Sequence, residues 1–301
     1  DSRCNSLEGV FSFGAYELNG TTLRPIHTLN DSRPLAIGSA FKLYILGALA
    51  EEIAAGRARW DEPLAINDEL KSLPSGQMQL EPEGQEFPIS RYAELMISIS
   101  DNTAADHLLH RIGRAKVEAY MARLNPDAGK SLPFLSTMEM FKLKLSPDRT
   151  LADRYARADT AARRAMLAEG GEGARAVSSV AGGALWKAPY EIERIEWFAS
   201  ASECCRVMAD LHRLEQQSGM QPLSHALRIN PGLQFDAKVW PSVAYKGGSE
   251  PGVLNMTWLL TREDGKLFLV SIGWNNTKKE VDLKQAADLA GAGGAAGGEE
   301  G

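Results

Sequence analysis

Residues 37–50 have the sequence IGSAFKLYILGALA. From Ala40 to Ala55 the chain is apolar on almost every side of a helical projection, with one early interruption at Lys42. A surface helix carries an apolar stripe on one face, whereas a helix that is apolar all round is buried. The sequence therefore predicts a central helix over Ala40–Ala55, with the other elements of the domain packed around it.

Strand patterns lie toward both ends of the chain. Asn19-Gly20 separates two β-type runs, and this pair is a strong signal of a tight hairpin because both residues adopt positive φ. Asp264-Gly265 separates two similar runs near the other end. Strands at both ends with helices between them predict an α/β (α+β) fold, in which about five strands form one antiparallel sheet. The predicted strands are Val10–Leu18, Thr21–Leu29, Ser242–Tyr245, Val253–Arg262 and Lys266–Trp274.

The chain between these strands has helical patterns. We assign residues 1–290 to a single domain, with its sheet part at about 8–35 and 225–290 and its helical part at about 36–224. Residues 291–301 contain mainly Gly and Ala and are expected to form a flexible tail. The predicted helices besides the central one are Ser90–Ile97, Thr103–Ile112, Arg149–Glu169, Ile195–Gln217 and Lys278–Leu289.

The composition excludes several classes of partner. The 301 residues carry 33 basic and 39 acidic side chains, a net charge of −6, so we expect neither nucleic acid nor an anionic membrane surface as a partner. No uncharged apolar stretch reaches about 18 residues, so no membrane span is predicted. The sequence starts at Asp1 rather than Met, so we expect that upstream residues were removed, and secreted, periplasmic and cytoplasmic locations all stay open. Cys4, Cys204 and Cys205 are odd in number, and free thiols are expected.

Ser39 and Lys42 form the first pair of residues that could carry chemistry. Positions i and i+3 share one face of a helix, so the hydroxyl and the amine can meet. Burial in an apolar helix disfavours the charged form of a lysine, which allows the amine to act as a general base. About one Ser-x-x-Lys is expected by chance in a chain of this composition, so the pair needs support from other motifs.

Ser100-Asp101-Asn102 gives the first support. The tripeptide lies in the loop between two predicted helices, where polar side chains can project into a cleft. Asp101 or Asn102 can also cap the helix that follows, but capping does not explain Ser100.

Lys246-Gly247-Gly248-Ser249 gives the second support. It follows the strand predicted at 242–245, its glycines let a ligand approach the backbone, and its lysine supplies a local cation that the net charge lacks. The three motifs together are expected about 0.004 times by chance in such a chain, so they form one functional signal.

In this order the three motifs resemble those of the serine β-lactamase and penicillin-binding-protein superfamily, with class A β-lactamases nearest. Residues 37–50 and 92–109 (YAELMISISDNTAADHLL) are similar to class A sequences, and the likeness covers roughly 10–120 and 200–290. The resemblance implies a β-lactamase-like fold and a mechanism in which a serine is acylated. It implies Ser39 as the nucleophile, Lys42 as its base, Ser100 as the proton relay to the leaving group, Asn102, Lys246, Gly247 and Ser249 as substrate-binding residues, and the N–H groups of Ser39 and Ser249 as the oxyanion hole.

Two features depart from the class A pattern. Class A enzymes activate the deacylating water with the Glu of a Glu-x-x-Leu-Asn motif, but this chain has no Asn between Asn125 and Asn230. That interval holds an atypical, enlarged insertion at about 126–195, in which each acid is interpreted first as a solvated helix charge. Gly247 stands where Thr or Ser is common, which removes a hydroxyl from the carboxylate site, and whether Ser249 replaces it stays open. The acids considered, from the region between Ser100 and Lys246, are Glu139, Glu191, Glu193 and Glu196.

Both departures point away from an efficient penicillinase. The pattern is similar to actinobacterial β-lactamase-like serine hydrolases, such as those encoded with clavulanic acid biosynthesis, which carry an extra N-terminal domain. We expect a serine acyl-hydrolase that acts as a weak or selective β-lactamase, with esterase activity as an additional outcome. The alternatives are a D,D-peptidase or penicillin-binding protein, and a non-enzymatic β-lactam or peptidoglycan sensor. The expected substrate is a small β-lactam, ester or peptidoglycan-like amide bound by a monomer.

No cofactor and no metal are expected. His107 and His110 lie three positions apart on a predicted helix, but the spacing of the sequence places no third ligand beside them. The sequence leaves open the substrate, the deacylating group and the role of the insertion.

Overall fold

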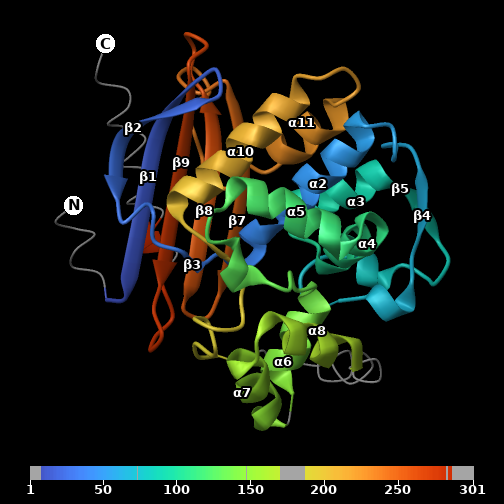
Figure 1. The fold of residues 1–301 in the computed structure, drawn as a ribbon. Coiled ribbons are helices and arrows are strands. Elements are labelled where there is room, and N and C mark those ends of the chain that lie inside the picture. The colour runs from blue at the N-terminus through green and yellow to red at the C-terminus, as the bar shows by residue number, and fades with distance from the viewer. Residues whose placement is uncertain (1–7, 73, 147, 170–186, 283, 287–301) are drawn as a thin grey trace.

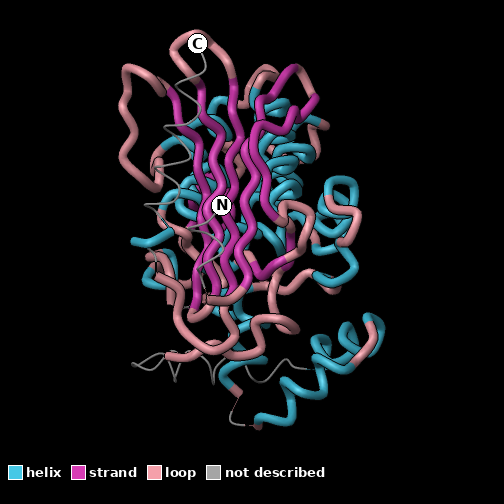
Figure 2. The backbone as a smooth tube through the Cα atoms, turned by 90° about the vertical axis from the view of Figure 1, so that its left-hand side faces the viewer, coloured by secondary structure: helices cyan, strands magenta, loops and turns pink. Residues whose placement is uncertain are grey.

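The computed structural model describes residues 8–72, 74–146, 148–169, 187–282 and 284–286. Its main sheet has five antiparallel strands in the order β2-β1-β9-β8-β7, which confirms the predicted fold class. The strands of the two chain ends lie side by side in the middle of the sheet, where Val10 pairs with Asn275 (Figures 1 and 2). The strands are β1 (Val10–Asn19), β2 (Thr22–Leu29), β7 (Ser242–Glu250), β8 (Val253–Thr261) and β9 (Leu267–Asn275).

Helices cover one face of this sheet, whereas the helices of residues 137–169 lie beyond one end of it (Figures 1 and 2). The helices are α2 (Lys42–Ala54), α3 (Ile89–Ser98), α4 (Asn102–Ile112), α5 (Arg114–Leu124), α6 (Thr137–Leu145), α7 (Arg149–Arg157), α8 (Thr160–Glu169), α10 (Ala201–Glu215) and α11 (Gln221–Arg228). Short 3₁₀ turns are η1 (Gly38–Phe41), η2 (Asp68–Leu70), η3 (Met78–Leu80) and η4 (Ala128–Ser131). Two small sheets pair β3 (Leu35–Ala36) with β6 (Phe198–Ala199) and β4 (Pro63–Ala65) with β5 (Glu86–Pro88).

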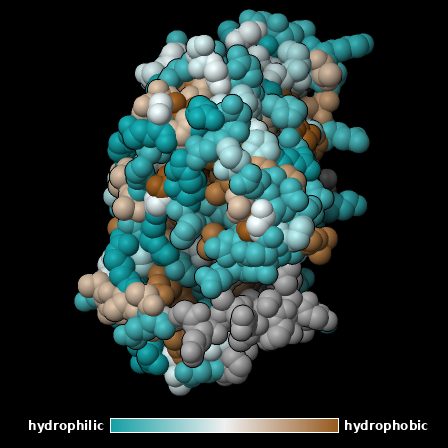
Figure 3. Space-filling model, turned by 90° about the vertical axis from the view of Figure 1, so that its right-hand side faces the viewer, coloured by the Kyte–Doolittle hydropathy of each residue, from teal (hydrophilic) through white to brown (hydrophobic). Residues whose placement is uncertain are grey.

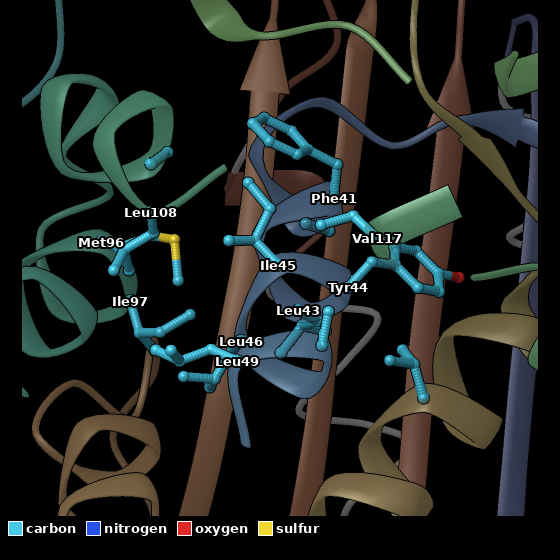
Figure 4. Packing of buried hydrophobic residues seen from close by; sticks show 14 of the residues in the cluster. Phe41, Leu43, Tyr44, Ile45, Leu46, Leu49, Met96, Ile97, Leu108 and Val117 are labelled. Carbon is cyan, nitrogen blue, oxygen red and sulfur yellow. The ribbon is translucent and has the colours of Figure 1, made fainter. Parts of the chain in front are cut away.

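The central helix α2 is buried on all sides, as its composition predicts. Its side chains extend in opposite directions: Ile45 lies toward Met96 and Leu108 of the neighbouring helices, and Tyr44 lies on the other side (Figure 4). The α2 helix begins at Lys42 rather than at the predicted Ala40, because residues 38–41 form the tighter turn η1. The outer surface of the helical region is mainly hydrophilic, with scattered apolar side chains (Figure 3).

The sheet is apolar on both faces. Leu259 and Leu269 face the helices, whereas Trp258, Phe268 and Trp274 belong to a second cluster on the opposite face. Side chains from residues 233–243 cover part of that second cluster. The β8 strand is therefore covered on both faces along nearly all its length, and the edge strand β7 pairs with it.

Several predicted boundaries are wrong, and each has a local cause. The helix predicted over Arg149–Glu169 is two helices, because Asp159 leaves the helical path and caps α8 through the N–H of Ala162. The helix predicted from Ile195 begins only at Ala201, since Ser200 and Glu203 form a capping box there. The helix predicted over Ser90–Ile97 begins one residue earlier, after Pro88.

Near the C-terminal end, residues 278–282 are not helical, contrary to the prediction of a helix over Lys278–Leu289. Asp282 accepts hydrogen bonds from the N–H groups of Lys284 and Gln285, so it acts as a cap for the helical residues 284–286. Residues 287–301, including the predicted tail, lie outside the described residues. No helix in the described ranges is long and apolar enough to cross a membrane. Cys204 and Cys205 are buried free thiols, and Cys4 also lies outside the described residues.

Candidate active site

Ser39 lies in η1, at the start of the buried helix α2. Gly38 precedes it with φ +49°, a conformation that favours glycine. A Cβ on Gly38 would lie 2.9 Å from the Ser249 nitrogen, so the backbone of β7 approaches the Ser39 turn very closely. The fold therefore brings Ser39 and Ser249, 210 positions apart, to the same place, as their predicted shared oxyanion hole requires.

Lys42 is fully buried and sits between two serines. Its Nζ lies 3.0 Å from Ser39 Oγ and 3.1 Å from Ser100 Oγ. Nζ also donates to two groups that can only accept, the Ser100 carbonyl oxygen at 2.8 Å and the Asn102 amide Oδ1 at 2.7 Å. The amine is thus within hydrogen-bond distance of both predicted reacting hydroxyls.

Ser100 lies in the short connection between α3 and α4, as predicted. Its φ is +60°, which is uncommon for a residue with a side chain and marks a position held by its surroundings. Asp101 fixes the backbone next to Ser100, because its buried carboxylate accepts hydrogen bonds from the N–H groups of Gln77, Met78 and Ala104. The connection is therefore fixed to two neighbouring segments, and the Ser100 side chain is positioned between two lysines.

Lys246 reaches Ser100 from the other side. Its Nζ lies 3.1 Å from Ser100 Oγ and 2.6 Å from the Gly247 carbonyl oxygen. It lies inside β7, which runs to Glu250, so the prediction that Lys246–Ser249 follow the strand is wrong. Pairing with the buried strand β8 continues through both glycines, which outweighs their low strand propensity.

Burial controls the protonation of both lysines. It lowers the pKa of Lys42 well below its usual value, and the positive charge of Lys246 lowers it further, against the opposing effect of Asp106 and Asp101. Burial also lowers the pKa of Lys246 to about 7. These shifts favour the neutral form of Lys42, which can accept a proton, and place Lys246 close to its titration midpoint near pH 7.

A cavity of about 420 Å³ opens beside these residues. The cavity is lined by the predicted site residues Ser39, Ser100, Lys246, Gly247 and Ser249. Asn102 differs: it is 3% exposed, its amide oxygen is held by Lys42, and it does not line the cavity.

None of the described residues that line this cavity is an Asp or a Glu. Glu139 caps α6, Glu191 pairs with Arg194, and Glu193 is exposed elsewhere. Glu196 is buried, contrary to its interpretation as a solvated charge, and pairs with Lys144. Beside the Ser39 turn, Phe41 stacks on Trp197 with ring centroids 3.7 Å apart and meets Phe134 edge-on at 5.8 Å. Aromatic rings therefore pack beside the Ser39 turn.

Sequence reasoning missed several residues of the cavity wall, among them Tyr245 and Asn230. Tyr245 lies next to the recognised Lys246, and Asn230 donates from its side-chain Nδ2 to the Ser98 carbonyl oxygen. Tyr245 could have been noticed as the aromatic residue that ends the predicted strand, whereas no motif marks Asn230. Neither histidine of the predicted pair lines this cavity, and His107 binds two backbone groups, the N–H of Asn67 and the carbonyl oxygen of Thr103. The described residues hold no cluster of ligands suited to a metal.

The antiparallel sheet, the buried central helix and the serine–lysine arrangement together define the class of serine hydrolases of the β-lactamase type. The family model of the Beta-lactamase enzyme family matches residues 5–288, and the chain belongs to this family, which confirms the predicted resemblance. No curated protein matches the sequence.

Solved structures share the fold at low sequence identity. A β-lactamase from Sphaerobacter thermophilus is 17% identical with a TM-score of 0.62, covering 94% of this chain and 88% of that one. The TLA-1 extended-spectrum β-lactamase is 14% identical with a TM-score of 0.65, covering 94% and 90%. A mutant of PBP-A, solved as an acyl-enzyme complex with penicillin G, is 14% identical with a TM-score of 0.59, covering 93% and 86%. The fold is thus common to β-lactamases and to PBP-A.

Proposed function

We propose that this chain forms an acyl-enzyme at Ser39 and hydrolyses β-lactam amides weakly or selectively. The observation that carries the proposal is the hydrogen bonding of Lys42. A neutral amine has two N–H groups and one lone pair. The Ser100 carbonyl and the Asn102 amide oxygen take the two N–H groups, so the lone pair is left for a hydroxyl proton, and Ser39 Oγ lies 3.0 Å away.

The reaction follows from this arrangement. Lys42 accepts the proton of Ser39 as Oγ attacks the carbonyl carbon, and the N–H groups of Ser39 and Ser249 stabilise the negative oxygen that forms. The C–N bond then breaks, and Ser100 gives its proton to the departing nitrogen. The proton on Lys42 returns to Ser100, whose Oγ lies 3.1 Å from Nζ. The products are an ester at Ser39 and an amine, and water later releases the acid.

Slow release of the acyl group is part of the proposal. A deacylating water needs a base, and the described residues lining the cavity include no carboxylate. Lys42 is the remaining base in contact with Ser39. This same observation favours the second candidate, a D,D-peptidase or penicillin-binding protein, for which β-lactams form long-lived adducts.

Intact-protein mass spectrometry separates these outcomes. The protein is incubated with a penicillin, a cephalosporin and an activated ester, alongside a Ser39→Ala variant. We expect an adduct that depends on Ser39 and that decays within minutes for at least one substrate. An adduct stable for hours with every β-lactam favours the penicillin-binding alternative. If no Ser39-dependent adduct or turnover occurs with any of the three, the proposal fails.

A further inference from the structure

Tyr245 has no role in the reaction described above, yet its ring is fixed at the edge of the active-site cavity. A Cβ on Gly232 would lie 2.5 Å from the ring atoms Cε1 and Cζ of Tyr245. A Cβ on Gly247 would lie 2.8 Å from Cζ and closer still to the hydroxyl oxygen Oη. The ring thus occupies a slot that exists because both neighbours are glycines.

Trp258 closes this slot. Its ring centroid lies 5.2 Å from that of Tyr245, and its own Nε1 donates to the Pro231 carbonyl oxygen. The tyrosine is therefore held by two backbone segments and a buried tryptophan. An aromatic ring held in this way delivers its hydroxyl to one place at little entropic cost.

The Tyr245 hydroxyl lies over Gly247, where a side chain at that position would begin. Within the described part of the chain, this hydroxyl has no hydrogen-bond partner, although its residue lines the cavity beside Lys246. Burial raises the pKa of Tyr245 to about 12, so the hydroxyl keeps its proton and can donate.

Lys246 presents a second donor to the same cavity. A protonated ammonium has three N–H groups, of which Ser100 Oγ and the Gly247 carbonyl oxygen use two. Lys246 is the only cation among the described residues that line the cavity, and no acid lines it. Asn230 does not compete, because it is engaged with the Ser98 carbonyl oxygen and the Gly232 N–H.

We propose that the Tyr245 hydroxyl and the Lys246 ammonium, whose residues line the same cavity, together bind a carboxylate on the leaving-group side of the substrate. Tyr245 is thus a specificity-determining residue, and it supplies the hydroxyl that position 247 lacks. The inference rests on the proposed function, because Ser100, the predicted donor to the leaving group, defines which side of the substrate faces Lys246.

Equilibrium binding tests this inference without requiring acylation. A penicillin and its methyl ester differ only in the carboxylate, and a Ser39→Ala variant can bind them without reacting. We expect Ser39→Ala to bind the acid more tightly than the ester. Adding Tyr245→Phe, which keeps the ring, should weaken binding of the acid by about tenfold or more while changing the ester little. Adding Tyr155→Phe, a substitution in the distant helix α7, is the matched control and should change neither.

The outcomes are distinct from those of the proposed function. Equal affinities for acid and ester in Ser39→Ala would overturn the inference, and so would an equal loss for both ligands on adding Tyr245→Phe. Absence of an adduct on the wild-type protein would overturn the proposed acylation alone. Thermal unfolding of each variant shows whether the ring still packs, since a merely structural role of Tyr245 would lower the melting temperature without changing the preference for the acid.

Discussion

Replacing Gly248 with Ala tests whether the approach of β7 to the Ser39 turn matters for catalysis. A Cβ at this position would lie 2.6 Å from the Ala40 nitrogen and closer to Ile37 O and Ser39 N. All three are backbone atoms, which cannot rotate away. Ordinary Cβ contacts begin near 3.4 Å, so the strand must retreat by about one ångström, and a displacement of that size costs about 100-fold in rate when it separates catalytic groups.

The assay is the rate of Ser39 acylation by a penicillin, followed by quenched mass spectrometry. We expect Gly248→Ala to be acylated about 100-fold more slowly, because the Ser249 N–H moves away from the oxygen it should stabilise. Gly129→Ala is the matched control, since a Cβ there meets nothing within 4 Å and its φ is ordinary. Circular dichroism checks that both variants fold. Acylation of folded Gly248→Ala within about threefold of wild type would refute the reasoning, because the predicted loss is far larger.

Three further predictions follow from buried lysines. Lys42→Ala should abolish acylation in the same mass-spectrometric assay and leave the fold largely intact. Lys238→Ala, at an exposed site, is the control and should behave as wild type. Near-normal acylation of Lys42→Ala would mean that another group is the base. Lys246 has a pKa of about 7 and is charged below that pH, so the binding preference for the acid over the methyl ester should fall as pH rises through about 7, and a flat ratio would contradict this. Lys144→Ala leaves two buried carboxyl groups without their cation, so urea denaturation should show a loss of about 3–5 kcal/mol of unfolding free energy. Arg59→Ala, which breaks a surface ion pair, should leave stability nearly unchanged, and equal effects of the two changes would count against the buried cluster.

Much of the site was predictable because its residues lie in short motifs. Ser39 and Lys42 are neighbours through helical spacing alone, and Ser100 was predicted in a connection between helices, where the structure places it. Lys246 is 146 positions from Ser100, so its placement depended on the motif pattern rather than on local rules. The antiparallel sheet followed from turn residues at both chain ends, which act locally.

The rest depends on contacts that a sequence does not display. Lys246–Ser249 was predicted to follow the strand Ser242–Tyr245, but pairing with β8 keeps these residues in the sheet. The slot for Tyr245 needs Gly232, which no pattern links to it. The sequence around Glu196 does not distinguish it from a surface acid, and its burial is explained by the ion pair with Lys144 of α6. Such long-range packing overrides local preference.

The pairing of β1 with β9 has a consequence for how the protein becomes active during synthesis. Val10 can meet Asn275 only after synthesis has passed residue 275, and β7 is anchored to β1 through β8 and β9. Contacts between such distant residues form late, because long loops must close first. Under the proposed mechanism, a nascent chain that already contains Ser39, Lys42 and Ser100 therefore has an incomplete site, and it becomes reactive only when β9 joins the sheet.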